Sequence, residues 1–568
     1  MTNFAAKLHV FNGPSLSVPY RAISLRFNSN ELFGHSSSIS AQDIAALEPF
    51  FPENIFQRLA SEEEYADMAD FIAALAMSIQ EVNDELGLRY DINRDHGGET
   101  EILMGFCSEQ AARSALHSAL RMALFVKGRL PGSEQGFQEW LKSLFLLQKR
   151  LQPLSTSARM LKYSRQAGIP HYQLDATSRH ISYGQGVHST LFNGSLSSRD
   201  SHIGEELQRN KFLTNKLLRT MGYPCTRQYL AYDLPTAQDH VRKLGFPLVI
   251  KPSSASRGSG VTSNIRDAKD IDKAFKFAAR YSNGEVIVER FIAGDEHRIT
   301  VSNGKVIGLT HKAPPAVVGD GHSTIRELIE AENAARIANK TSGNWHHAIP
   351  LDEALDDFLK LEHLTVDSVP EPGQKVVLRD NAGVTTGGTR PSVIHLMHPD
   401  IEEMALSIAR VFRLRTIGVD FITTDISASW RDTGKVIEVN AFPSLYGKLS
   451  ELMLKEFFPA DRRGRIPSVL IVTDSPASSV AKLQGKLHEE LITGYVDRGT
   501  TRLDGVERLF DGESLYRRCV SLLIDTLCEA IVVAADADEI IGNGLPLEFF
   551  DEVYIETQDT RTEDLAAQ

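Results

Sequence analysis

The sequence predicts a mixed α/β protein made of several domains. Residues 206–455 alternate between strand-like and helix-like segments, which is typical of α/β architecture. Residues 1–155 instead mix short strands with longer helices, since apolar residues recur at helical spacing in Glu62–Leu86 and Ser108–Phe125. A chain of 568 residues is long enough for about three or four domains. We therefore expect several mixed α/β regions in series.

Four regions follow one another along the chain. An N-terminal α/β domain is expected at 1–155, and a shorter segment with one helix and a short strand at 156–205. A central domain is expected at 206–460. It holds the clearest hairpin, because Asn303-Gly304 is a strong tight-turn signal between two alternating strands. The linker DRRGRIP then leads to a small α/β region at 466–568.

The composition narrows the classes of partner. The net charge is −13, which argues against a protein whose main partner is nucleic acid. The four cysteines form no CxxC pair, so neither a disulfide framework nor a zinc site is indicated. The first residues lack the pattern of a signal peptide, and no apolar run approaches the roughly 20 residues of a membrane span. We expect a cytoplasmic protein without a membrane partner.

The stretch GFPLVIKPSSASRGSGVT suggests a phosphate site. The apolar run Phe246–Ile250 predicts a buried strand that ends at Lys251, whose charge can reach over the following loop. Gly258 and Gly260 would let the backbone of that loop approach an anion closely. The loop matches neither GxxxxGK[ST] nor GxGxxG, so a plain surface loop after a strand is the alternative.

Acidic residues on predicted strands suggest nucleotide and metal sites. Glu289 lies in a strand-like run, and Glu296, seven residues later, could bind the ribose hydroxyls; two solvent-exposed acids are the alternative. Further along, Asp420, Glu438 and Asn440 lie on strands whose other side chains are apolar. Side chains alternate along a strand, so Ile437 and Val439 should share the face opposite to Glu438 and Asn440. These oxygen ligands suit Mg²⁺, whereas a hydrogen-bonded polar pair at a sheet edge is the alternative.

This series resembles the ATP-grasp fold. It comprises a helical lysine at 211, a strand-end lysine with a glycine loop, the acids at 289 and 296, and Asp followed by Glu-x-Asn. Residues of about 155–465 are similar to the ligase half of cyanophycin synthetases. The phrases that carry this similarity are RNKFLTNKLLRTMGYPC, VERFIAGDEHRITV, PPAVVGDGHSTIRELIEAEN, LTVDSVPEPGQKVVLRDNAGVTTGGT, GVDFITTDIS and IEVNAFPS. An ATP-grasp domain is therefore expected at 206–460, with 156–205 as a segment preceding it.

The resemblance implies how ATP and Mg²⁺ would be held. Lys211 and Lys251 match lysines that contact the phosphates, and the loop Ser253–Gly260 looks like the lid over them. The nucleotide-binding positions that this implies are Lys211, Lys251, Ser253, Arg257, Gly258, Gly260, Glu289, Phe291, Ile292 and Glu296, with the last as the ribose carboxylate. The Mg²⁺ ligands that it implies are Asp420, Glu438 and Asn440.

The resemblance also implies an amide-forming reaction. Arg298 and Arg379 match arginines near the phosphates and the reacting carboxylate, and they join Lys251 as catalytic positions. A substrate carboxylate would attack the γ-phosphate of ATP, and an amine would then displace phosphate from the acyl phosphate. Amino acids or short peptides are the implied substrates, and a dimer or tetramer the implied assembly. The implied substrate-side positions are Asn381, Thr385, Thr386, Gly387, Gly388 and Arg390. The nearby histidines, His297, His311 and His322, are interpreted as structural or surface residues.

The sequence departs from cyanophycin synthetases in two places. Those proteins continue into a Mur-type ligase with a phosphate loop, whereas the predicted strand 467–473 is followed here by DSPASSVAKL, without glycine or GK[ST]. We expect 466–568 to be a shortened, inactive Mur-like remnant, with 514–535 as one of its helices; an unrelated small α/β domain is the alternative. On the substrate side, Arg390, Ser392, Phe442, Ser444 and Asn215 differ from the family pattern and make aspartate specificity doubtful.

Three functions remain open on the sequence alone. The first is an ATP-dependent carboxylate–amine ligase, with an N-terminal domain that binds the acceptor or forms an oligomer contact. The second is an inactive pseudo-ligase that binds nucleotide. The third is a processive poly-amino-acid synthetase, which differs from the first only in product length.

Overall fold

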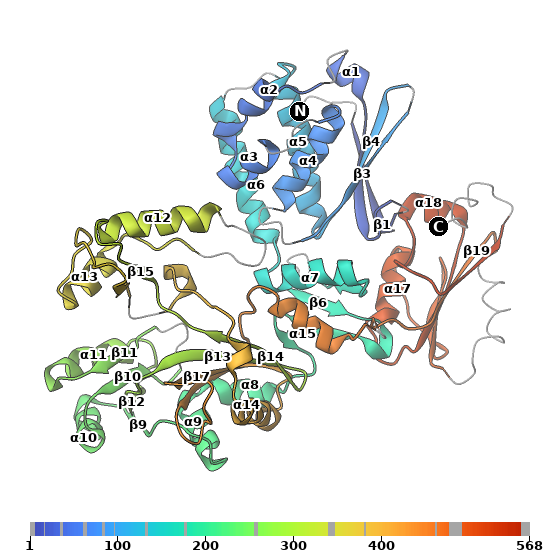
Figure 1. The fold of residues 1–568 in the computed structure, drawn as a ribbon. Coiled ribbons are helices and arrows are strands. Elements are labelled where there is room, and N and C mark those ends of the chain that lie inside the picture. The colour runs from blue at the N-terminus through green and yellow to red at the C-terminus, as the bar shows by residue number, and fades with distance from the viewer. Residues whose placement is uncertain are drawn as a thin grey trace. The chain divides into compact units, whose positions relative to one another are not determined.

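The computed structural model describes most of the chain and divides it into two compact units. Unit 1 comprises Met1–Gly194 together with Phe458–Gln568, and unit 2 is Ser195–Phe457. Both contain helices and sheets (Figure 1), so the predicted mixed α/β class is confirmed. The described residues are 6–15, 17–34, 38–60, 65–81, 86–95, 97–130, 134–174, 179–254, 259–338, 347–379, 382–460, 463–475 and 491–557.

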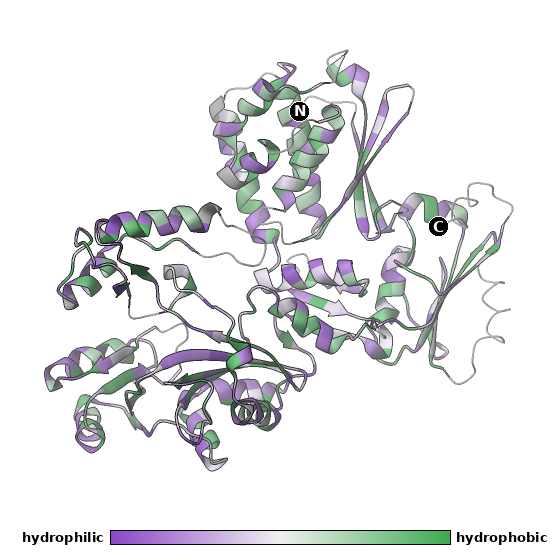
Figure 2. Ribbon diagram, in the orientation of Figure 1, coloured by the Kyte–Doolittle hydropathy of each residue, from purple (hydrophilic) through white to green (hydrophobic). Residues whose placement is uncertain are grey.

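The N-terminal part of unit 1 is an antiparallel sheet packed against helices. The strand order is β1-β2-β4-β3. Helices α4 and α5 begin where side chains cap them: Asp67 accepts from the amides of the first turn of α4, and Ser108 from that of α5. Much of these two helices carries the apolar colour in Figure 2, because they form the core with the sheet. The elements are β1 (Lys7–Pro14), β2 (Arg21–Asn28), α1 (Ser29–Phe33), α2 (Ala41–Ala45), α3 (Glu53–Ala60), α4 (Met68–Gln80), β3 (Tyr90–Arg94), β4 (Glu99–Gly105), α5 (Glu109–Val126) and α6 (Glu134–Leu151).

The remainder of unit 1 joins a short sheet to the C-terminal sheet. The C-terminal strands have the order β22-β21-β20-β23-β19-β24, and β20, β23, β19 and β24 run parallel. Backbone hydrogen bonds from Val187 to Cys528 (2.9 Å) and from Leu545 to Pro14 (2.7 Å) tie the parts of this unit together. The elements are α7 (Ser155–Ala167), β5 (His171–Gln173), β6 (His180–Tyr183), β7 (Thr190–Asn193), β19 (Ser468–Thr473), β20 (Thr493–Val496), β21 (Thr501–Leu503), β22 (Val506–Glu507), α17 (Leu515–Leu523), β23 (Ala530–Ala535), α18 (Ala537–Asn543) and β24 (Glu552–Glu556).

One expectation about this region is wrong. Residues 514–535 do not form one helix: α17 ends at Leu523, and the apolar run AIVVAA is the buried strand β23. The reason is that β23 is a central parallel strand covered on both faces. Such strands are continuously apolar and lack the alternation that distinguishes a strand from a buried helix.

Unit 2 contains two four-stranded antiparallel sheets and a two-stranded one. The orders are β11-β10-β12-β9, β14-β13-β17-β18 and β15-β16. Each sheet packs its own helices around a separate apolar cluster. The elements are β8 (Leu196–Ser197), α8 (His202–Arg209), α9 (Lys211–Thr220), β9 (Gln228–Ala231), α10 (Leu234–Leu244), β10 (Leu248–Pro252), β11 (Thr262–Ile265), α11 (Ile271–Ala279), β12 (Val286–Arg290), β13 (Asp295–Ser302), β14 (Lys305–His311), β15 (Ala316–Val318), α12 (Ile325–Ala338), α13 (Glu353–Leu361), β16 (Lys375–Val377), α14 (Pro399–Phe412), β17 (Thr416–Thr423), β18 (Lys435–Asn440) and α15 (Leu449–Phe457).

The predicted hairpin is confirmed in the sheet β14-β13-β17-β18. Asn303 and Gly304 join β13 to β14 and have φ angles of 44° and 85°. A two-residue turn of this kind needs positive φ at both positions, which asparagine and glycine tolerate best. The turn fixes which residues of β13 and β14 face each other, and thus which side chains share a face.

The same sheet has one apolar and one polar face. Ile299 on β13, Val419 on β17 and Val439 on β18 enter a core that also contains α14. A bulge in β18 lies between the pairs Asp420–Glu438 and Phe421–Val436. The predicted strict alternation is therefore wrong at Ile437, which is the extra residue of the bulge and is only partly buried. In the part of the chain that the structure describes, no helix is long and apolar enough to cross a membrane.

Candidate active site

Three charged residues lie in register across the polar face of this sheet. Arg298 on β13 is directly opposite Asp420 on β17, and Asp420 is directly opposite Glu438 on β18. Directly opposite residues of antiparallel strands project their side chains to the same face. We call Arg298, Asp420 and Glu438 the charged row.

Arg298 holds the centre of the charged row. Its Nη2 donates to Oδ2 of Asp420 at 2.8 Å, and its Nε donates to Oδ1. Asp420 is 1 % exposed. Burial alone would raise the pKa of its carboxyl, but the charges of Arg298 and Lys312 outweigh burial and hold that pKa below its usual range. Gly418 leaves room for the Arg298 side chain to lie over β17, because a Cβ at position 418 would be 2.8 Å from Cδ of Arg298.

Lys312 is a functional candidate that the sequence interpretation missed. Its Nζ pairs with Glu296 and lies 3.6 Å from Oδ2 of Asp420. Burial and the negative charge of Asp420 raise the pKa of Glu296. Residue 312 lies opposite 296 because the pairing of β13 and β14 shifts by one residue between Thr300 and Val301, and the Lys312 amide donates to the Glu296 carbonyl. The turn alone would bring residue 311 opposite 296, so the sequence carried only a partial signal for this pair.

A second buried ion pair lies in the neighbouring sheet. Nζ of Lys251 on β10 is 2.5 Å from Oε1 of Glu289 on β12, and the two side chains are 9 % and 5 % exposed. The other carboxylate oxygen of Glu289 accepts from the Thr226 hydroxyl at 2.6 Å and the Gln228 amide at 2.7 Å. Glu289 therefore orients the lysine that the sequence connects with phosphate.

The start of α9 links the two sheets. Asn210 caps the helix, and the amide of Lys211 donates to the carbonyl of Ser253 just beyond β10 (3.2 Å). Nζ of Lys211 is 3.3 Å from Oε1 of Glu438, so this lysine contacts the end of the charged row. The residues that line a small pocket between α9 and β18 are Gln208, Lys211, Thr214, Asn215, Leu218, Cys225, Val436, Ile437, Glu438 and Val439.

The structure describes some of the other predicted nucleotide-binding residues and not others. The Ser253 hydroxyl donates to Glu285 at 3.1 Å, and Gly260 has a φ of 74° that favours glycine. Phe291 and Ile292 follow β12 and are half-buried. Three predicted positions lie outside the described residues: Arg257, Gly258 and Asn381.

The two predicted arginines have different partners. Arg379 donates through Nη2 to the Pro350 carbonyl (2.9 Å) and to Asp352 (2.7 Å), whereas Arg298 belongs to the charged row. The Arg379 guanidinium is therefore held by the segment that contains Pro350 and Asp352.

The predicted substrate loop forms a compact turn. Thr385 and Thr386 lie in the single 3-10 turn Val384–Thr386. The carbonyl of Gly387 accepts from Arg336 (2.9 Å), and the amide of Gly388 donates to the Gly383 carbonyl (2.8 Å). Thr389 then pairs with Ala313 in both directions, which brings Arg390 next to the segment that carries Lys312.

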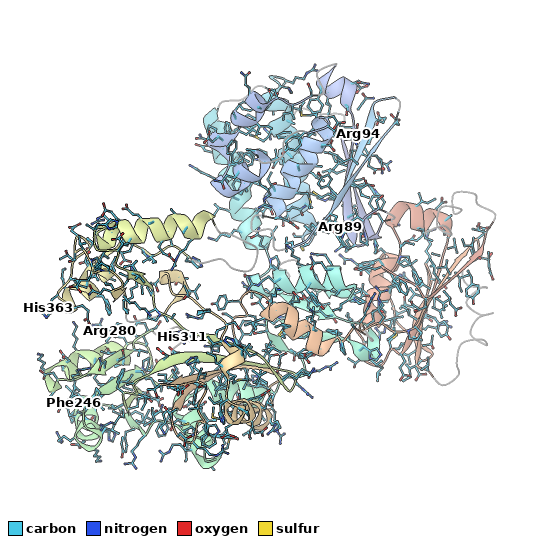
Figure 3. All side chains as sticks on the ribbon, in the orientation of Figure 1. Arg89, Arg94, Phe246, Arg280, His311 and His363 are labelled. Carbon is cyan, nitrogen blue, oxygen red and sulfur yellow. The ribbon has the colours of Figure 1, made fainter. Side chains whose placement is uncertain are left out.

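The two histidines of the hairpin are packed against each other. His297 and His311, the latter labelled in Figure 3, stack with ring centroids 5.3 Å apart. Burial and the neighbouring His311 lower the pKa of His297, whose Nδ1 lies 3.0 Å from the Asp295 carbonyl. This arrangement agrees with the structural role expected for them.

The donor set suits a hard divalent cation. The carboxylates of Asp420 and Glu438 share one face, and the Asn440 amide lies 3.4 Å from Oδ2 of Asp420. Oxygen ligands of this kind fit Mg²⁺, which binds few protein ligands and keeps several waters. Among the described residues, no group of three or more His, Cys, Asp and Glu side chains could hold a metal. The predicted set consists of two carboxylates and the Asn440 amide.

The sequence is similar to those of several known ligases and synthetases. The family model "D-ala D-ala ligase C-terminus" matches residues 226–315. Cyanophycin synthetase from Trichormus variabilis is 28 % identical over 508 residues, which cover 85 % of this chain and 55 % of that protein. The glutathione biosynthesis bifunctional protein from Mannheimia succiniciproducens is 30 % identical over 325 residues, covering 55 % and 41 %.

A solved structure is also similar. The bifunctional glutathione synthetase from Pasteurella multocida has a TM-score of 0.43 and 18 % identity, covering 78 % of this chain and 82 % of that one. The chain spans about half the length of the cyanophycin synthetases that it matches. The predicted resemblance to cyanophycin synthetase is confirmed.

Proposed function

We propose that this chain is an ATP-dependent ligase that joins the carboxylate of one amino acid or short peptide to the amine of another. The observation that carries the proposal is the charged row, Arg298–Asp420–Glu438, whose end contacts Lys211. Lys251, paired with Glu289 in the neighbouring sheet, adds a second lysine. Buried carboxylates paired with cations on one sheet face suit the transfer of a phosphoryl group, where charge develops on several oxygens at once.

The proposed reaction has two steps. A carboxylate oxygen of the first substrate attacks the γ-phosphorus of ATP, and the bond to the β–γ bridging oxygen breaks, which releases ADP. The amine nitrogen of the second substrate then attacks the carbonyl carbon of the acyl phosphate. Inorganic phosphate leaves with the bonding electron pair, and the proton lost by the amine passes to phosphate or solvent.

Each charged residue has a role in this scheme. Lys211 and Lys251 would bind the phosphates of ATP, and Arg298 and Lys312 would neutralise charge on the transferring group. Asp420, Glu438 and Asn440 would hold Mg²⁺, which supplies positive charge to the phosphate oxygens when bound. Glu289 would act as a positioning residue for Lys251, because its carboxylate is held in turn by Thr226 and Gln228.

The remaining regions have subsidiary roles in the proposal. The N-terminal domain would bind the acceptor or form an oligomer contact, giving a dimer or tetramer in the cytoplasm. The C-terminal region would be a Mur-like part without nucleotide binding. The support for this is that the residues after β19, DSPASSVAKL, contain no glycine whose backbone could cradle a phosphate.

The test is release of phosphate from ATP and Mg²⁺ with amino acids supplied singly and in pairs. Release that requires two particular amino acids, with an amide product seen by mass spectrometry, is the expected result. Glu438→Gln should abolish it, whereas Glu402→Gln on the exposed face of α14 is the matched control. Release without an amide product, or full activity in Glu438→Gln, would contradict the proposal. Product length separates a single ligation from polymerisation.

A further inference from the structure

Arg390 is a half-buried cation that pairs with no carboxylate in the part of the chain that the structure describes. Its Nη1 donates to the Thr389 carbonyl at 2.8 Å and its Nη2 to the Ala382 carbonyl at 2.5 Å. A guanidinium carries five N–H donors, so three are left over. Among the residues that the structure describes, no carboxylate lies within ion-pair distance of it. A partly desolvated arginine that is bound only by neutral carbonyls keeps an uncompensated charge.

The charges around Arg390 belong to the candidate active site. Burial and the charge of Arg298 lower the pKa of Arg390, while Glu296, Asp420 and Tyr446 act in the opposite direction. Asp420 is already bound by Arg298 and Glu296 by Lys312. Counted over the described residues, this corner of the site therefore holds one positive charge more than its carboxylates balance.

The backbone fixes where this charge lies. Thr389 bridges to Ala313, and Ser392 bridges to Thr310, so the segment carrying Arg390 runs antiparallel to the end of β14. Lys312 lies between those two bridge positions on the β14 side. Arg390 is thus held beside Lys312, whose Nζ lies 3.6 Å from Oδ2 of Asp420, on the side of the loop that the sequence connects with the substrate.

We propose that Arg390 binds a carboxylate of the substrate that ATP does not activate, and so selects amino acids or peptides that keep a free carboxylate beyond the reacting groups. The inference rests on the proposed ligase function. A carboxylate fits better than a phosphate of ATP, because Lys211, Lys251 and Arg298 already account for the phosphates. The edge of a guanidinium also presents two parallel N–H groups that match the two oxygens of a carboxylate.

The test compares each ligand as free acid and as carboxamide. The probes are aspartate, glutamate, arginine, alanine and their dipeptides, each with a free or amidated α-carboxyl group, added with Mg²⁺ and a non-hydrolysable ATP analogue. Binding is read by the shift in melting temperature and by calorimetry, and turnover by phosphate release. We expect at least one free acid to bind roughly tenfold or more tightly than its amide. Arg390→Gln should reduce that ratio to about one, and Arg390→Lys should retain part of it. Arg410→Gln, on the exposed surface of α14, is the matched control.

The two readouts separate this inference from the proposed function. Acid preference in the wild type that is lost in Arg390→Gln, with unchanged affinity for the ATP analogue, supports the inference even if no turnover is found. Equal binding of acids and amides by the wild type overturns it, as does an acid preference that survives Arg390→Gln. Weakened binding of the ATP analogue, with the acid-to-amide ratio intact, would assign Arg390 to the phosphates and also overturn it. Failure of the ligase proposal is recognised separately, by the absence of amide product with any pair.

Discussion

Replacing Glu289 by Gln removes the negative member of the buried pair with Lys251 while leaving the shape of the side chain unchanged. At 2.5 Å and an effective dielectric constant of about 20, the attraction between the two charges is about 7 kcal/mol. Part of this offsets the cost of burying both groups. Breaking a buried pair from one side typically costs about 3–5 kcal/mol, because a charge stays buried without its partner. The Thr226 and Gln228 hydrogen bonds to the side-chain oxygen can persist, so we expect a loss of about 3 kcal/mol.

Urea unfolding measures this loss, and hydrogen exchange locates it. Peptides that cover β10 and β12 should lose protection, whereas those of β13 and β17 should keep it. The double variant Lys251→Met/Glu289→Leu leaves no uncompensated charge and should be more stable than either corresponding single variant. A loss below about 1 kcal/mol in Glu289→Gln, or strictly additive losses in the double variant, would refute the reasoning.

Three further predictions concern the sheet β14-β13-β17-β18. Because the pKa of Asp420 is lowered, its stabilising contribution is complete above about 3.8 and is lost as the pH falls. Asp420→Asn should therefore flatten the acid limb of a plot of unfolding free energy against pH. Because burial and Asp420 raise the pKa of Glu296, stability should fall as the pH rises through the range above about 4.5. Glu296→Gln should remove this fall, and urea unfolding from pH 2.5 to 7 checks both variants. Gly418→Ala would displace Arg298 and should lower the turnover number about 10–100-fold in the phosphate-release assay. It should also lower the melting temperature, because the buried Asp420 would lose part of its pairing; unaltered turnover would show that the position of Arg298 is not critical.

Local features could be predicted from the sequence. The hairpin at Asn303-Gly304 is correct because the turn type depends on two adjacent residues. The strand expected at 467–473 is found as β19, since its apolar run is short and ends at a turn. The run AIVVAA was placed in a helix, because a strand buried on both faces has no alternation to distinguish it.

The candidate site was harder to assemble from the sequence. That Asp420 and Glu438 lie opposite each other depends on strand register, which the bulge at Ile437 shifts by one residue. A bulge leaves no mark in the alternation of apolar residues. Lys312 was missed because a lone lysine after a strand reads as a solvated charge until its partner in the hairpin is counted. The pairing of Arg379 with Asp352 joins segments 27 residues apart, and no local pattern predicts it.

The pairing of Asp420 with Arg298 and of Glu438 with Lys211 bears on how a divalent ion would enter the proposed site. Two carboxylates that face each other across adjacent strands would repel each other if neither had a counterion, and a cation would then have to draw them together. Here the protein carries its own counterions, so the carboxylates stand in place before any ion arrives. In the proposed ligase, binding of the ion with the nucleotide would then be an exchange, in which the ammonium of Lys211 and the guanidinium of Arg298 leave their carboxylates for the phosphates. The charges that hold these carboxylates in place would thereby become available to the nucleotide.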